Sequence, residues 1–131
     1  MKVSFAYPPN FAEIKAAFRI AGRSGIIFTY GDTIFNPSRV EIPPDLHAHE
    51  AVHERQQRQH TPAKWWDRYI HDQGFRYTQE LEAYRAQYRF AEANYGRDQR
   101  RSLLKHISKT LAGPMYGNMV TPTAARAAIT K

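Results

Sequence analysis

The pattern of apolar and polar positions predicts helices over most of the chain and short strands only near its start. Between residues 11 and 21, apolar positions recur at the three- and four-residue spacing that places them on one helical face. Asn10 suits the N-cap of this helix and Gly22 suits its C-cap. The residues that share the face are Phe11, Ile14, Phe18 and Ala21.

Gly31 and Asp32 separate two short apolar runs and therefore predict a β-hairpin. The runs cover residues 26–30 and 33–35, and a glycine in the first turn position favours a type II′ turn. Residues 40–42, just before Pro43 and Pro44, are a candidate third strand. These strands together predict a small sheet near the N-terminus.

The rest of the chain has the spacing and the start signals of helices. Asp45 is a suitable N-cap for the first, and Thr61 followed by Pro62 is a typical start of the second. The predicted ranges are about 45–60, 62–72, 74–95 and 98–112, with a short last helix from about 122. The predicted fold class is α+β, a mainly helical single domain over residues 1–131 with a small N-terminal β-sheet or hairpin.

His49, Glu50 and His53 form the pattern HExxH within the first of these later helices. Histidines four residues apart lie on one helical face, so two imidazoles can reach one metal ion. The glutamate between them can act as general base on metal-bound water. Zinc suits nitrogen and oxygen ligands, and because the chain has no cysteine, any zinc must be held by histidine and carboxylate.

A catalytic zinc needs a third protein ligand, and the helix over residues 74–95 offers Glu80 and Glu82. Glu80 lies at the edge of the predicted inward-facing stripe of that helix, whereas Glu82 points roughly to the opposite side. Since a buried carboxylate needs a partner, Glu80 is the predicted ligand and Glu82 the reserve. The stripe consists of Tyr77, Leu81, Tyr84, Tyr88, Ala91 and Tyr95.

An HExxH helix followed by a later helix that carries a glutamate resembles the gluzincin branch of the zinc metallopeptidases. The chain is most similar in style to the minimal zincin-like proteins of bacteriophages and prophages. In gluzincins the third ligand begins an ExxxD pattern, and Glu80 matches its first position. The resemblance covers about residues 45–87, and the first 44 residues match only in layout. It implies a zinc metallopeptidase that cleaves a peptide or protein substrate by Glu50-assisted attack of zinc-bound water.

Two parts of such a site are not settled by the motif. Tyr84 stands where gluzincins carry the aspartate that orients a zinc histidine, so its hydroxyl or a carboxylate elsewhere would have to replace it. Peptide hydrolysis also needs a donor for the charge on the carbonyl oxygen. Tyr116 is the candidate, with His71, His106 and Tyr84 as alternatives, although packing between helices is the commoner role for such a tyrosine.

The chain is basic, with 19 Lys and Arg against 12 Asp and Glu and a net charge of +7. This excess favours nucleic acid, anionic surfaces or acidic partners. The densest run covers residues 97–109, where Arg97, Arg101 and Lys105 share one helical side. A solvated helix face is the commoner interpretation, and a surface for phosphates is the alternative. The alternative function is therefore a basic protein that binds nucleic acid or a phage assembly on a zincin scaffold with structural or vestigial metal.

Two further patterns concern packing and location. Trp65, Trp66, Tyr69 and Ile70 form an aromatic cluster that we expect in the core, with a peptide-binding wall or a base-stacking platform as the alternative. Apolar runs are only a few residues long, and prolines interrupt the N-terminal segment. We therefore expect no membrane contact and a cytoplasmic protein, in the host cytoplasm if phage-encoded.

Overall fold

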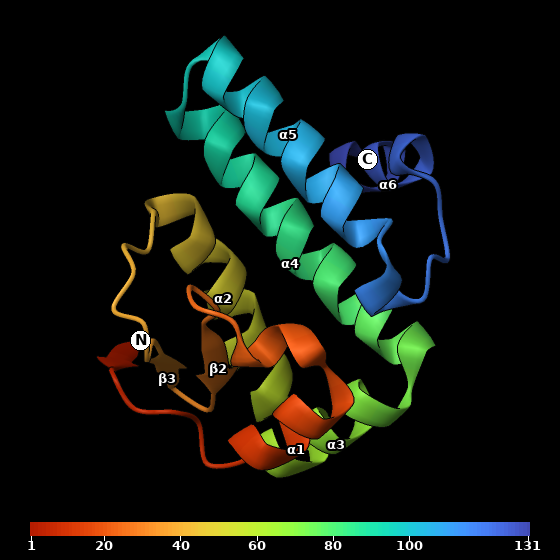
Figure 1. Ribbon diagram of the computed structural model, residues 1–131. Coiled ribbons are helices and arrows are strands. Elements are labelled where there is room, and N and C mark those ends of the chain that lie inside the picture. Colours follow the sequence, from red (N-terminus) through yellow and green to blue (C-terminus); the bar gives the residue numbers. More distant parts are fainter.

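Six α-helices and a three-stranded sheet make up the fold, which a computed structural model describes for all residues 1–131 (Figure 1). Helix α2 (Pro44–Arg58) packs against strand β2 and against the long helix α4 (Gln73–Asn94). Helices α5 (Arg97–Leu111) and α6 (Pro122–Thr130) cover α4 elsewhere, while α1 (Phe11–Ala17) and α3 (Pro62–His71) lie at the other end of the molecule. The predicted mainly helical α+β fold is confirmed.

The sheet contains the predicted hairpin but a different third strand. Strands β2 (Phe28–Tyr30) and β3 (Thr33–Phe35) pair antiparallel, and β1 (Lys2–Ser4) pairs parallel to β3. Gly31 has a φ of 62° whereas Asp32 does not have a positive φ, as a type II′ turn requires.

The strand predicted at residues 40–42 is wrong. The Asn36 side chain donates to the Val40 carbonyl at 2.8 Å and accepts from the Val40 N–H at 3.1 Å. Both backbone groups of Val40 are therefore used locally and cannot join a strand ladder.

One predicted helix end and one predicted helix start differ in the structure. Helix α1 ends at Ala17, and an extended Phe18 leads into a 3₁₀ turn, Arg19–Gly22, so that Phe18 and Ala21 both reach the core. Asn10 occupies the N-cap without a side-chain hydrogen bond.

Helix α2 begins at Pro44, with Pro43 rather than Asp45 as its N-cap. The fixed φ of proline suits the first helical position, so the N-cap lies two residues earlier than predicted. The carboxylate of Asp45 is thereby free for tertiary contacts. In contrast, the predicted cap of α3 is confirmed, because the Thr61 hydroxyl accepts from the Lys64 N–H at 3.1 Å.

Apolar side chains form two separate cores. The first joins the N-terminal helix, the sheet and α3, and the predicted aromatic cluster lies in it with Trp65, Trp66 and Tyr69 buried. The second joins α4, α5 and α6 around Leu104, Ile107, Leu111, Ala125 and Ile129. Helix α4 is covered by α2 and α3 as well as by α5 and α6. Its buried residues therefore include Glu80 and Gln87, which lie beside the predicted inward-facing stripe of tyrosines and apolar residues. None of the helices has both the length and the apolar character needed to cross a membrane.

Gln57 fixes the hairpin to α2 from a fully buried position. Its Nε2 donates to the Thr29 carbonyl at 2.8 Å, and its Oε1 accepts from the Gly31 N–H at 2.7 Å. We expect Gln57→Leu to lower the free energy of unfolding by about 1–3 kcal/mol, because the Gly31 N–H loses its acceptor, whereas the Thr29 carbonyl keeps the Trp66 Nε1 donor at 3.0 Å. Urea denaturation measures the change, and Gln59→Leu, at an exposed position, serves as the control with a shift within about 0.5 kcal/mol. Equal losses in the two variants would contradict this account of Gln57.

Candidate metal centre

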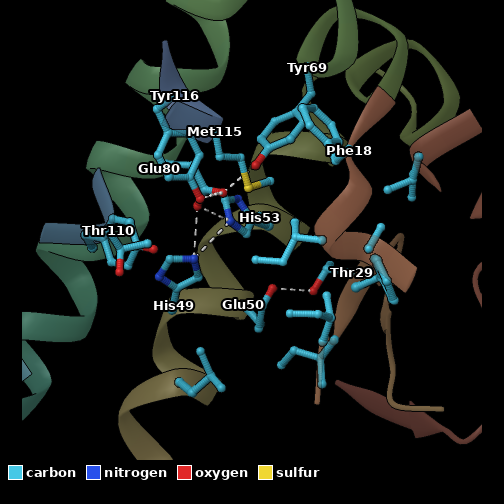
Figure 2. Close-up of a pocket in the computed structure, with 18 of the residues that line it drawn as sticks. Phe18, Thr29, His49, Glu50, His53, Tyr69, Glu80, Thr110, Met115 and Tyr116 are labelled. Carbon is cyan, nitrogen blue, oxygen red and sulfur yellow. Dashed lines mark hydrogen bonds and ion pairs between the residues drawn. The ribbon is translucent and has the colours of Figure 1, made fainter. Parts of the chain in front are cut away.

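Three buried ligand atoms, two from α2 and one from α4, meet at one point (Figure 2). The Nε2 atoms of His49 and His53 lie 3.1 Å apart, and Glu80 Oε1 lies 3.1 Å from the first and 2.9 Å from the second. All three residues are at most 6% exposed. The four-residue spacing of the histidines on α2 and the inward face of α4 together bring about this convergence.

Two glutamines fix the proton on the outer nitrogen of each imidazole. Gln87 donates from Nε2 to Asp45 Oδ2 at 2.8 Å, so its amide oxygen faces His49 and accepts from Nδ1 at 3.0 Å. Gln56 donates from Nε2 to the Gln79 carbonyl at 3.0 Å, and its amide oxygen accepts from His53 Nδ1 at 2.8 Å. Since each Nδ1 carries a proton, each Nε2 is the nitrogen that can bind a metal.

The spacing of the three ligand atoms suits one small cation. Ligand atoms about 2.0–2.1 Å from a tetrahedral zinc ion lie about 3.3 Å from one another. The observed separations of 2.9–3.1 Å need only a slight expansion to reach that geometry. The buried group of His49, His53 and Glu80 could therefore hold a metal ion.

The two oxygens of Glu80 have different partners. Oε1 faces the histidines, whereas Oε2 accepts from the hydroxyls of Tyr69 at 2.5 Å and Tyr116 at 3.2 Å. Arg76, itself buried, donates to the backbone carbonyls of Tyr69 at 2.8 Å and Met115 at 2.7 Å. Arg76 thus fixes the two segments that supply these tyrosines. Because the tyrosines occupy Oε2, only Oε1 of Glu80 faces the metal position.

The charges of the centre depend on one another. Burial alone lowers the pKa of His53, but the adjacent Glu80 carboxylate outweighs it and raises the pKa to about 9. Burial alone raises the pKa of Glu80, but His53 and His49 hold it well below its usual range. Burial and the charge of Glu80 raise the pKa of Tyr69 and Tyr116 well above 10, so both hydroxyls keep their protons and donate.

Glu50 lies beside this group but makes a different contact. The Thr29 hydroxyl, on β2, donates to Glu50 Oε2 at 2.7 Å, and Oε1 has no hydrogen-bond partner in the protein (Figure 2). A cavity of about 310 Å³ adjoins the ligand group, and it is lined by Glu50, the three ligand residues and mostly apolar side chains. Strand β2 therefore orients one oxygen of Glu50 and leaves the other available.

The remaining predicted residues fall in different places. Glu82 is exposed, accepts from Gln56 and pairs with Arg55, so it lies outside the ligand group. Tyr116 lies in the centre, bonded to Glu80, and Tyr84 packs edge-on against His49 with ring centres 4.7 Å apart. His106 lines the cavity, whereas His71 is exposed and donates to a backbone carbonyl of its own helix. Neither Tyr84 nor a carboxylate contacts Nδ1 of His49, which bonds to Gln87 instead.

Three residues of the centre, Gln87, Asp45 and Tyr69, were not predicted from the sequence as parts of it. Gln87 lies seven residues after Glu80, two helical turns along the same face, and that spacing was an available indication. Asp45 bonds to both Gln87 and the Tyr95 hydroxyl, at 2.8 and 2.7 Å, although its position suggested a helix cap. Tyr69 belongs to the core as predicted, yet its hydroxyl also binds the ligand carboxylate.

Removing Gln87, the partner of His49 Nδ1, tests whether the hydrogen bonds from the imidazoles to the glutamines support metal binding. With zinc as the probe metal, we expect Gln87→Leu to weaken metal affinity about 10–100-fold, because the ring loses its fixed orientation and tautomer. Competition with a coloured chelator measures this, and Gln99→Leu, the same change at an exposed site on α5, should leave the affinity unaltered. An unchanged affinity in a folded Gln87→Leu protein would contradict the role of Gln87.

The raised pKa of His53 predicts how metal-free protein responds to pH. Its imidazole has a pKa of about 9 when folded and about 6.5 when unfolded, so its contribution to stability is complete below pH 6.5. The contribution is lost as pH rises through 9, at no more than about 1.4 kcal/mol per pH unit. Urea unfolding in chelator between pH 6.5 and 9.5 should show this decline, and His53→Gln should abolish it. A wild-type stability that is flat over this range would contradict the coupling of His53 to Glu80.

Comparison with known protein families, curated proteins and solved structures finds no match to this chain. The similarity to gluzincins therefore depends on the residues themselves. The contacts of His49, Glu50, His53 and Glu80 are the basis for any conclusion about function.

Proposed function

We propose that the protein is a zinc-dependent hydrolase, and specifically a metallopeptidase. The observation that carries this proposal is the convergence of His49 Nε2, His53 Nε2 and Glu80 Oε1 within 3.1 Å of one another. Two imidazole nitrogens and one carboxylate oxygen are the donor set of catalytic zinc sites that keep a position open. A zinc ion bound there supplies a Lewis acid that lowers the pKa of a water molecule to about 7.

Glu50 is the proposed general base. Its Oε1 has no partner in the protein and lies in the same cavity, so it can accept a proton from water and pass it to the leaving nitrogen. The hydrogen bond from Thr29 to Oε2 restricts the carboxylate to one orientation during this transfer.

The walls of the cavity favour an apolar segment of peptide as substrate. Ile14 of α1, Phe18 directly after that helix and Phe28 of β2 line it together with Trp66. An apolar side chain buried there would contribute binding energy in proportion to the area removed from water. Tyr116, the proposed donor to the carbonyl oxygen, would first have to release Glu80 Oε2.

Glu50→Gln tests the proposed base. We expect the variant to retain about one zinc per chain and to lose hydrolysis of a mixed peptide library by a factor of about 100 or more, because the amide cannot accept the proton. Glu54→Gln, on the same helix but half-buried and paired with Arg58, is the matched control and should keep its activity.

Two results would contradict the proposal. Wild-type protein that carries no zinc after purification without chelators rules out the metal site. A zinc-loaded wild type that cleaves no peptide in the library contradicts peptidase activity and favours the alternative of a binding protein on this scaffold.

A further inference from the structure

A groove between α5 and α6 contains unpaired positive charge away from the metal centre. It has a volume of about 520 Å³, and its basic side chains are Arg101 and Lys105 from α5 and Arg126 from α6. No acidic residue lines the groove, and none of the three cations forms an ion pair in the protein. A solvated helix face alone does not explain the contribution of Arg126 from a second helix.

The N-terminus of α6 opens into the same groove. Pro122 and Thr123 line it, and the first turn of this nine-residue helix contains no acidic side chain. The Thr121 hydroxyl caps the Ala124 N–H at 3.1 Å, and the Thr121 carbonyl accepts from Ala125 at 2.9 Å. The N–H of Thr123 has no partner in the protein, so the positive end of the helix dipole retains a free donor.

Ser108 supplies an independent indication of a ligand. It lines the groove, is 4% exposed, and its hydroxyl has no hydrogen-bond partner. Two threonine hydroxyls in these helices bond to a backbone carbonyl four residues earlier, Thr110 to His106 and Thr130 to Arg126, whereas Ser108 makes no such bond. Buried hydroxyls are usually bonded, so the unpaired Ser108 hydroxyl is a donor available to a bound group.

We propose that the groove between α5 and α6 binds a phosphate group through Arg101, Lys105, Arg126, the Ser108 hydroxyl and the Thr123 N–H. A phosphate presents several acceptor oxygens and a charge near −2, which matches a set of donors without any acceptor carboxylate. The phosphate belongs either to a free ion or to a nucleic-acid backbone. This inference does not depend on the proposed hydrolase activity.

A titration of the full chain with inorganic phosphate, followed by amide NMR shifts at constant ionic strength, tests the site. Saturable shifts are expected at Thr123 and around Ser108. The double variant Arg101→Gln, Arg126→Gln should weaken binding at least tenfold, and Ser108→Ala should weaken it about threefold or more. Arg97→Gln makes the same kind of charge change on α5 outside the groove and should alter the affinity less than twofold.

Several results overturn the proposal. They are shifts centred on the metal ligands instead of the groove, equal weakening by Arg97→Gln and the double variant, or unchanged binding by a folded Ser108→Ala protein.

A labelled mixed-sequence DNA oligonucleotide then distinguishes the two sources of phosphate. Binding that is tighter than that of inorganic phosphate, weakens as salt rises and is lost in the double variant indicates a nucleic-acid backbone. Phosphate binding with no tighter binding of the oligonucleotide indicates a free phosphate. Oligonucleotide binding that the double variant leaves unchanged counts against the groove as its site.

Discussion

The interaction on which the rest of the centre depends is the burial of the Glu80 carboxylate against two histidines. A carboxylate buried without partners is expensive, and Glu80 is 6% exposed. The fold compensates by giving Oε1 to His49 and His53 and Oε2 to the hydroxyls of Tyr69 and Tyr116. With both imidazole Nδ1 atoms bonded to glutamines, the remaining ring nitrogens and Oε1 face one point that only a proton or a cation can fill favourably.

Helix α2 connects this centre to both halves of the molecule. One of its sides carries Gln57, which binds the hairpin, and Glu50, which accepts from Thr29 of the same hairpin. The side that carries the two histidines faces α4, where Glu80 and Gln87 lie two turns apart. The small sheet therefore positions the proposed base, and the long helix positions the third ligand. Both parts of the chemistry depend on the same fifteen-residue helix.

Features set by local spacing could be predicted from the sequence. The helices, the HExxH face and the preference for Glu80 over Glu82 follow from periodicity within one helix, and the hairpin follows from the turn residues Gly31 and Asp32 between two apolar runs. Features set by contacts between distant segments could not. Strand β1 is three residues long and exists only by pairing with β3, and Asp45 leaves the cap position because Pro44 starts the helix. Gln87 replaces the expected partner of His49 because the packing of α2 against α4, which joins residues 38 positions apart, brings its amide to the ring.

X-ray absorption at the zinc edge on the purified protein tests whether His49, His53 and Glu80 together bind one metal ion. The expected spectrum contains two imidazole nitrogens and oxygen ligands at about 2.0–2.1 Å in four-coordinate geometry. A spectrum without imidazole scattering, or one that is unchanged in His53→Gln, would contradict this expectation.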